Sequence, residues 1–332
     1  MGGVYGIGNP LMDIVMKGSY ADLERLGVRP GTMNLIDHDT QALVLGSGTD
    51  PVRLPGGSAA NTLRGTAFLS GSANNPSVRM WYGGAVGADE MSRQFAEGLS
   101  AVGVRPLVAT VDAPTGSSAI LVTPDLERTM FTHLGACRLF GEDDIDTAVL
   151  AESDWLYTTG YMWDTESQER AVRRAIGLAA EHRTAVAFDI ADPFVVERYH
   201  RRLVEYLPGR IDLIFGNEEE LARLTGFTGE PEGLAQAARR FAPIVALKIG
   251  KRGCVVASED GVRRIEGFAV DARDTTGAGD AYAGGFLYAL LTGESIDKAA
   301  GLANRLAAAV VTVPGCRYDA LDGGAILREG LG

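Results

Sequence analysis

Short apolar runs alternate with longer amphipathic segments along the second half of the chain. The runs predict buried strands at 155–159, 185–190, 211–215 and 244–249. The segments between them carry apolar residues at helical spacing and predict helices at 165–181, 193–206, 218–224 and 232–241. Strands that alternate with helices in this way are typical of βαβ units. We therefore expect an α/β fold with a mostly parallel central sheet and helices on both of its faces.

The first third of the chain departs from this rhythm. A strand at 4–7 and a helix at 58–69 fit the same sheet, but short β-like runs lie around them, at 13–16, 32–36, 51–54, 118–122 and 129–134. We expect these runs to form a small β-sheet lid over the edge of the central sheet, from segments at approximately 11–18, 31–37, 50–56 and 104–134. Residues 1–332 are interpreted as a single domain that carries this lid.

The stretch 274–280, which reads DTTGAGD, precedes an apolar run with the spacing of a buried helix. Free N–H groups and the positive end of the helix dipole make such a terminus an anion site, and glycine lets a phosphate approach the backbone closely. The carboxylate of Asp280 would repel a bound phosphate, so its position here indicates a catalytic role. The role that fits is taking a proton from an attacking hydroxyl. The alternative is an ordinary glycine-rich turn with a capping Asp.

The overall charge narrows the classes of partner. A net charge of −12 argues against nucleic acid and anionic membrane surfaces, although local helix termini can still hold the phosphates of ATP. The three cysteines are widely spaced and form no CxxC pair, which indicates a reduced protein without a cysteine metal site. No apolar window is long enough to span a membrane, and the start resembles no signal peptide. We expect a cytoplasmic protein that is a monomer or a homodimer.

Polar side chains near the first predicted strand and helix are candidates for binding a substrate. Gly57 and Ser58 start a predicted helix, and Asn61 follows one turn later, where it can bond a ligand hydroxyl. Asn9 and Asp13 follow the first strand. An unpaired carboxylate among apolar residues is costly, and two neighbouring sugar hydroxyls would satisfy it. A capped helix and a salt-bridged loop Asp explain the same residues without a ligand.

Polar residues also follow the later strands. Asn217 and Glu220, three residues apart, can orient a hydrated Mg²⁺, although acidic residues in a first helical turn are favourable for the dipole alone. Lys248, Gly250 and Gly253 form a glycine-punctuated strand end that suits a nucleotide, but the signal is weak by itself.

Other phosphate-binding features are weak or missing. Arg128, in a predicted lid strand, is a candidate for countering phosphoryl charge, but a surface Arg without such a role is the commoner case. The chain has no GxxxxGK[ST] loop, and the N-terminal Gly6-Ile7-Gly8 lacks the third glycine of the dinucleotide fingerprint. A nicotinamide dinucleotide is therefore a poor candidate.

The order of these motifs resembles the ribokinase-like (PfkB) carbohydrate kinase family over essentially the whole chain. GGSAANTLRG at 56–65 and DTTGAGDAYAGGF at 274–286 are similar to its two signatures, and NEEE at 217–220 is similar to its NxxE element. The resemblance implies a three-layer α/β/α sandwich with a β-sheet lid. It also implies ATP-dependent phosphorylation of a primary alcohol, with Mg²⁺, and it leaves a requirement for K⁺ open.

The same resemblance assigns roles to the candidate residues. Asp280 is the catalytic base, and the backbone of Gly277, Ala278 and Gly279 is the anion hole for the phosphoryl group. The residues implied to hold the acceptor are Asn9, Asp13, Gly57, Ser58 and Asn61. Those implied to lie near ATP or its metal are Asn217, Lys248, Gly250, Gly253, Thr275 and Asn304, with Glu220 holding Mg²⁺ through water.

Within the family, GNPLMD at 8–13, Ser58 and PFVVERY at 193–199 are most similar to the adenosine kinase branch, since ribokinases usually carry Lys where Ser58 stands. We therefore predict phosphorylation of the 5′-hydroxyl of adenosine or a related purine nucleoside. Apolar walls for the base are expected from Met33, Leu35, Phe131 and Tyr161. A kinase of a free sugar such as ribose, fructose or 2-keto-3-deoxygluconate is the alternative. A non-catalytic nucleoside or sugar sensor is disfavoured, because a sensor has no need for Asp280.

Overall fold

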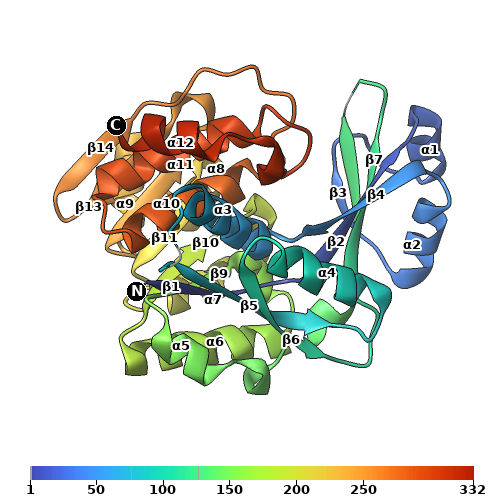
Figure 1. Ribbon diagram of the computed structural model, residues 1–332, viewed down its shortest axis with the longest axis horizontal. Helices are drawn as coiled ribbons and strands as arrows, with labels where there is room; N and C mark the ends of the chain where they lie inside the picture. Colours follow the sequence, from blue (N-terminus) through green and yellow to red (C-terminus); the bar gives the residue numbers. More distant parts are fainter. Residues whose placement is uncertain (1, 76, 126) are drawn as a thin grey trace.

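A nine-stranded sheet forms the centre of the protein in the computed structural model, which describes residues 2–75, 77–125 and 127–332 (Figure 1). Its strands are β1 (Gly3–Ile7), β5 (Arg79–Val86), β6 (Val104–Thr110), β9 (Trp155–Thr159), β10 (Ala185–Asp189), β11 (Leu213–Asn217), β12 (Ile244–Lys248), β13 (Cys254–Ser258) and β14 (Gly261–Ile265). The order is β14-β13-β12-β11-β10-β9-β1-β5-β6. Only the pairs β12–β13 and β13–β14 are antiparallel, so the expected mostly parallel sheet is confirmed. The described residues leave out positions 1, 76 and 126 of the predicted domain 1–332. Position 126 also belongs to the predicted lid segment 104–134.

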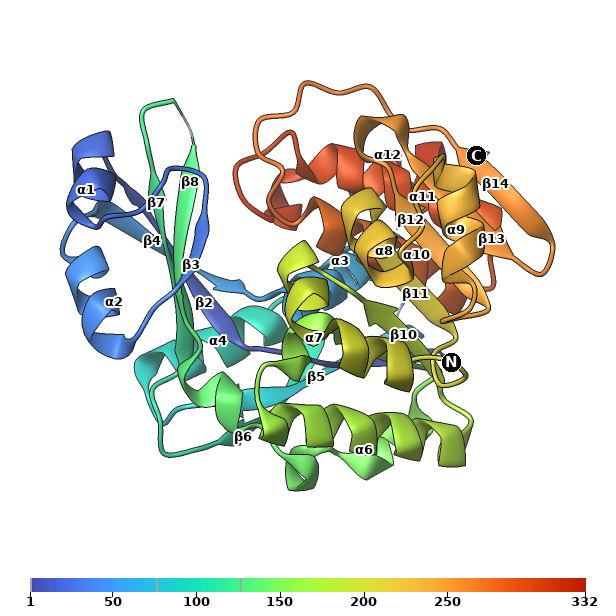
Figure 2. The same cartoon turned by 180° about the vertical axis from the view of Figure 1, so that it is seen from behind.

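Helices cover both faces of this sheet. One face packs against α5 (Thr147–Glu152), α6 (Glu166–His182), α7 (Pro193–Tyr206), α8 (Glu218–Thr225) and α9 (Pro231–Ala238). The other packs against α3 (Ser58–Ser72), α4 (Glu90–Ser100), α10 (Ala278–Leu291), α11 (Ile296–Val310) and α12 (Gly323–Leu331). Figure 2 shows α6 and α7 on one side of the strands and α10, α11 and α12 on the other. None of the helices in the described ranges combines the length and the apolar character needed to cross a membrane.

Each element follows from its local sequence. The strand β1 is buried along its whole length, as a strand covered on both faces must be, and it reads as a continuous apolar and glycine run. The helix α6 begins where the Thr165 hydroxyl accepts the N–H of Gln168 at 3.2 Å, and it ends at Arg183 in a left-handed conformation. Its buried residues recur at helical spacing, which holds the helix against the sheet.

A second, five-stranded sheet stands to one side of the body (Figures 1 and 2). Its order is β3 (Met33–Leu35), β8 (Arg128–His133), β7 (Gly116–Val122), β2 (Leu11–Lys17) and β4 (Thr49–Gly56). The short helices α1 (Tyr20–Arg25) and α2 (His38–Leu45), which the sequence did not predict, pack on the face that points away from the body. The strand alternation places Phe131, Ile14 and Leu121 in that packed face. The opposite face is thereby left for the body.

The expected lid segment 104–134 needs a correction. The strand β6 pairs in parallel with β5 and is the edge strand of the central sheet, so residues 104–110 belong to the body. The reason is the unit β5–α4–β6, a parallel crossover, which returns the chain to the same sheet. The described residues also include short 3-10 helices: η1 (Gly135–Leu139), η2 (Glu142–Asp144), η3 (Gly160–Trp163), η4 (Gly250–Arg252) and η5 (Tyr318–Ala320).

Candidate active site

The carboxyl ends of the central strands place several polar side chains in one row. The register aligns Thr159 with Asp189 across β9 and β10, and Asn217 with Lys248 across β11 and β12. Ligands of open α/β sheets bind beyond these strand ends. The site is therefore positioned by the register of the parallel strands.

The N-terminus of α10 lies at the same place. Gly277 caps the helix with φ at +74°, and a Cβ there would lie 2.7 Å from the Sγ of Cys316, so glycine is required. The first turn of a helix leaves N–H groups without intrahelical partners. The N–H of Ala278 is an exception to the expected anion hole, because it donates to the carbonyl of Thr275 at 3.2 Å.

Asp280 sits in this first turn and is held by α3. Its Oδ1 accepts the hydroxyl of Ser58 at 2.6 Å, and its Oδ2 accepts the amide of Asn61 at 3.1 Å. Burial raises the pKa of Asp280 to about 6, against these two hydrogen bonds, which lower it. The carboxylate is therefore oriented, ionised near neutral pH and basic enough to take a proton.

Asp280 lines a cavity of about 450 Å³ between the body and the lid, called here the acceptor cavity. All five residues predicted to hold the acceptor line it: Asn9, Asp13, Gly57, Ser58 and Asn61. Burial raises the pKa of Asp13 to about 6, and Arg128 and Arg64 act in the opposite direction. Gly57 has φ at +89°, and a Cβ on it would lie 2.3 Å from the carbonyl oxygen of Asn9. Contact of these residues with a substrate stays a prediction.

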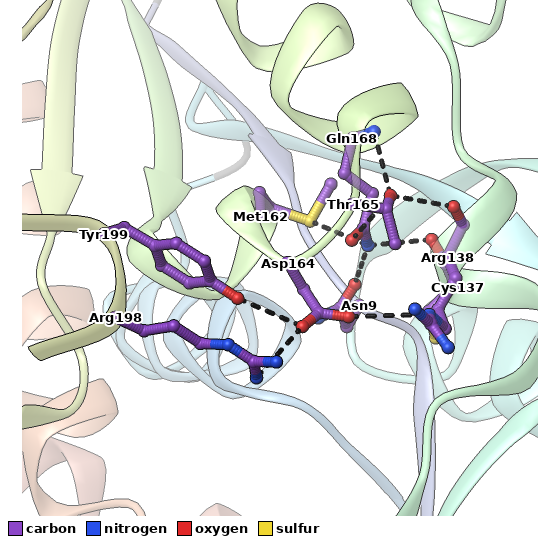
Figure 3. Close-up of polar contacts among 9 residues, drawn as sticks. All are labelled: Asn9, Cys137, Arg138, Met162, Asp164, Thr165, Gln168, Arg198 and Tyr199. Atoms are coloured by element: carbon purple, nitrogen blue, oxygen red, sulfur yellow. Dashed lines mark hydrogen bonds and ion pairs between the residues drawn. The ribbon is translucent and has the colours of Figure 1, made fainter. Parts of the chain in front are cut away.

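Asn9 is fixed by a residue that the sequence reasoning missed. The buried Nε2 of Gln168 donates to the Oδ1 of Asn9 at 2.7 Å and to the carbonyl of Cys137 at 2.8 Å (Figure 3). The amide nitrogen of Asn9 thereby remains available as a donor. Gln168 lies in the helix after β9, far from Asn9 in the sequence, so no local signal could connect the two.

Apolar and aromatic side chains form the rest of the acceptor cavity. Met33, Leu35 and Tyr161 line it as expected, and Phe194 and Tyr199 of α7 join them. Phe131 does not. It points to the outer face of the lid and is buried beneath the lid helices, while its neighbours Met130 and Thr132 face the cavity. The prediction for Phe131 was therefore wrong by one position in the strand alternation.

A second cavity, of about 620 Å³, lies on the other side of the α10 terminus and is called here the donor cavity. The predicted nucleotide residues that line it are Lys248, Gly250, Gly253, Thr275 and Asn304. Thr275 and Gly279 line both cavities. The two cavities therefore meet at the start of α10, where a phosphoryl group can pass from one to the other.

Lys248 stands at this meeting point. Its Nζ donates to both carboxylate oxygens of Asp189, at 3.1 and 3.0 Å, and would lie 3.3 Å from a Cβ on Gly279. Burial lowers the pKa of Lys248, but the carboxylates of Asp189 and Glu220 outweigh this and hold it above its usual value. Asp189, a carboxylate that ends an apolar strand, was missed by the sequence reasoning although its position was a readable signal.

Asn217 and Glu220 form a reciprocal cap at the start of α8. The side chain and the backbone N–H of Asn217 donate to Glu220 at 2.7 and 2.8 Å, and Asn217 accepts the N–H of Glu220 at 2.9 Å. Neither residue lines either cavity, within the described part of the chain. Burial raises the pKa of Glu220 to about 7.

A Mg²⁺ ion would have to reach the carboxylates of Glu220 and Asp189 through water, because neither residue is among the described residues that line the acceptor or the donor cavity. Glu220 and Asp189 offer carboxylate oxygens beside Lys248, and each oxygen of Glu220 keeps a free lone pair. Across residues 2–75, 77–125 and 127–332, no group of three His, Cys, Asp or Glu side chains could hold a metal ion by itself. Mg²⁺ keeps several waters and binds through few carboxylates plus phosphates, which these residues permit.

Arg128 is paired with Asp274 instead of facing a cavity. Its Nη1 lies 2.5 Å from the Oδ2 of Asp274, which also accepts the N–H of Gly315 at 2.7 Å. These bonds join lid strand β8 to the loop before α10. The predicted contact of Arg128 with a phosphoryl group stays a prediction.

A hydroxyl acceptor cavity with a partly buried base, a donor cavity and a helix N-terminus between them define a phosphotransferase. Residues 32–322 match the sequence model of the pfkB family of carbohydrate kinases. It is 27% identical to an adenosine kinase of Saccharomyces cerevisiae over 94% of this chain and 95% of that protein.

Two solved structures have the same fold. An adenosine kinase from Sinorhizobium meliloti has a TM-score of 0.88 and 33% identity, with 98% of each chain covered. A probable sugar kinase protein from Rhizobium etli CFN 42 has a TM-score of 0.89 and 29% identity, with 99% of this chain and 98% of that chain covered. The chain belongs to the pfkB carbohydrate kinase family and is an ATP-dependent kinase, and the predicted resemblance to the adenosine kinase branch is confirmed.

Proposed function

We propose that this kinase transfers the γ-phosphoryl group of ATP to the 5′-hydroxyl of adenosine or a closely related purine nucleoside. The observation that carries the proposal is the division of the acceptor cavity between carboxylates, Asp13 and Asp280, and an apolar and aromatic lining that includes Tyr161 and Phe194. A sugar with adjacent hydroxyls suits the first part, and a flat base suits the second. The similarity to adenosine kinases supports the same substrate.

The residues can divide the chemistry as follows. Asp280 takes the proton of the attacking hydroxyl as the new O–P bond forms and the bond to the β-phosphate oxygen breaks, with ADP leaving. The amides at the start of α10 and the ammonium of Lys248 stabilise charge on the phosphoryl oxygens. Glu220 would hold Mg²⁺ through water, and the ion would neutralise charge on the phosphates of ATP. The lid excludes water, which would compete as an acceptor.

The substrate proposal is tested by measuring ATP consumption with adenosine, inosine, guanosine, ribose, fructose and 2-keto-3-deoxygluconate. We expect the highest kcat/KM with adenosine. The specific alternative is a free-sugar kinase, favoured by the sugar kinase similarity. Turnover of a free sugar without turnover of any nucleoside would select that alternative and refute the nucleoside. The oligomeric state, a K⁺ requirement and a cytoplasmic location stay predictions.

The pH profile provides a second test. Because only the ionised carboxylate accepts a proton, kcat/KM for adenosine should fall on the acid side of about pH 6, the raised pKa of Asp280. Asp13 titrates in the same range and would steepen the fall beyond tenfold per pH unit if it must also be ionised. Rates with saturating Mg·ATP from about pH 5 to about pH 8.5 measure this. A rate that stays level down to pH 5 would exclude Asp280 as the base.

A further inference from the structure

Asp164 is a third acidic side chain in the lining of the acceptor cavity, and the phosphoryl transfer does not use it. It follows η3 and stands one residue before Thr165, the N-cap of α6. Its Oδ1 accepts the hydroxyl of Tyr199, which also lines the cavity, at 3.1 Å (Figure 3). Asp164 therefore belongs with the aromatic residues of the cavity and comes from a different element than Asp280.

Two arginines near Asp164 form ion pairs with its carboxylate but do not fill its hydrogen-bond acceptor positions. The Nε of Arg138 lies 3.5 Å from its Oδ2, and the Nη1 of Arg198 lies 3.7 Å from its Oδ1. Both separations exceed the length of a normal N–H···O hydrogen bond. The cap of α6 is supplied by Thr165, so the carboxylate of Asp164 does not serve that helix end either.

An ionised carboxylate has about four acceptor positions and no donor. Among the described residues, Tyr199 alone reaches the Asp164 carboxylate at hydrogen-bond length, and the side chain of Asp164 is 15% exposed. A mostly buried carboxylate with free acceptor positions is stabilised by a ligand that brings N–H donors. If Asp164 served only to join η1 to α7, we would expect shorter bonds to Arg138 and Arg198 and no position in the cavity lining.

We propose that Asp164 accepts a hydrogen bond from the exocyclic amino group of a purine base and so sets a preference for aminopurine nucleosides. This inference rests on the proposed nucleoside kinase function. Tyr161 and Phe194 supply apolar surface for the purine rings, and Asp164 accepts a hydrogen bond at the edge of the base. A base without a donor at that edge leaves the carboxylate without this hydrogen bond, and the loss of such a bond discriminates against that base.

The test compares adenosine with purine riboside, which differs only by lacking the amino group. We expect the unaltered enzyme to favour adenosine by roughly 10- to 100-fold in kcat/KM, as a hydrogen bond to a charged group implies. Asp164→Ala should lower kcat/KM for adenosine to the level of purine riboside, whose own value stays within about threefold. The control is Glu166→Gln, two residues away, whose 85% exposed side chain only pairs with Arg170. It should leave the ratio unchanged.

Asp164→Asn is a second variant of nearly the same shape, in case the alanine variant folds poorly. It keeps an acceptor and adds a donor, so inosine, with an oxygen at the same position, should gain relative to adenosine. Equal kcat/KM for adenosine and purine riboside in the unaltered enzyme would overturn the inference. So would an equal loss for both nucleosides in Asp164→Ala, which would mark a structural role. Either result leaves adenosine phosphorylation standing, whereas turnover of free sugars alone would refute the proposed function and this inference together.

Discussion

Replacing Asp280 with asparagine is expected to lower kcat by roughly 10²–10⁴-fold, the usual contribution of a general base, while nucleoside binding is largely retained. The new amide can keep both hydrogen bonds of the site, because its oxygen can accept from Asn61 and its nitrogen can donate to Ser58. The geometry is thereby preserved and the proton acceptor is lost. Rates with Mg·ATP, together with calorimetric binding of adenosine, measure the two effects separately.

The stability of the same variant separates lost chemistry from lost folding. Burial raises the pKa of Asp280 from 3.8 to about 6, so its ionisation opposes folding. The contribution of the protonated Asp280 to the free energy of unfolding is complete below about pH 3.8, and it is lost as the pH rises through about 6. Asp280→Asn should therefore melt at a higher temperature than the unaltered protein at neutral pH, and the difference should shrink towards pH 4. Asp322→Asn, at the cap of α12, is a matched control that should keep full activity, since Asn also caps helices. Equal loss of binding and turnover in Asp280→Asn would refute the assigned role.

Replacing Lys248 with methionine is expected to lower kcat by roughly 10²–10³-fold, the usual cost of losing one charge-stabilising donor. The methionine keeps most of the volume and removes the ammonium beside Gly279 and the meeting point of the two cavities. It also leaves Asp189 buried without its partner, and breaking such a pair typically destabilises a protein by about 3–5 kcal/mol. Single-turnover rates and urea unfolding measure the catalytic and the structural effects.

The double variant Lys248→Met with Asp189→Asn distinguishes these two effects. Removing the second charge should restore stability relative to Lys248→Met, and it should not restore kcat. Lys298→Met, in a half-exposed pair with Glu294, is the matched control and should change neither quantity much. If the double variant regained turnover together with stability, Lys248 would be a structural residue only.

Local sequence patterns were sufficient for most of the strand and helix alternation from β9 to β12 and for the motif around Asp280, but not for elements such as α1, α2, α4 and α11. A glycine at 277 followed by an apolar helix is encoded within a few residues, and the structure has that helix with Gly277 at its cap. Short β-like runs predicted the lid, but they did not show which face Phe131 occupies, because apolar residues lie on both faces of β8. A carboxylate at the end of a strand was visible at Asp189, but its partner Lys248 lies two strands away in the sheet.

The contacts that sequence reasoning missed join elements that are distant in the chain. Gln168 reaches Asn9 from α6, and Asp164 meets Tyr199 across the gap between η3 and α7. Parallel strands and their crossovers decide which residues meet at the sheet edge, and that register is not written in any one segment. The segment 104–110 was placed in the lid for the same reason, since only its pairing with β5 assigns it to the body.

Within the described residues the chain passes between the body and the lid at four places, β1 to β2, β4 to α3, β6 to β7 and β8 to η1, and Asn9 and Gly57 lie at the first two. A change in lid angle would shift the backbone beside these two residues, which line the acceptor cavity, so we expect ligand affinity and lid position to be coupled. Within the described residues, α1 and α2 contribute nothing to the lining of either cavity. Leu23 and Val44 lie in the packing beneath these helices, so substitutions there would test whether the outer face of the lid influences affinity without touching the ligand.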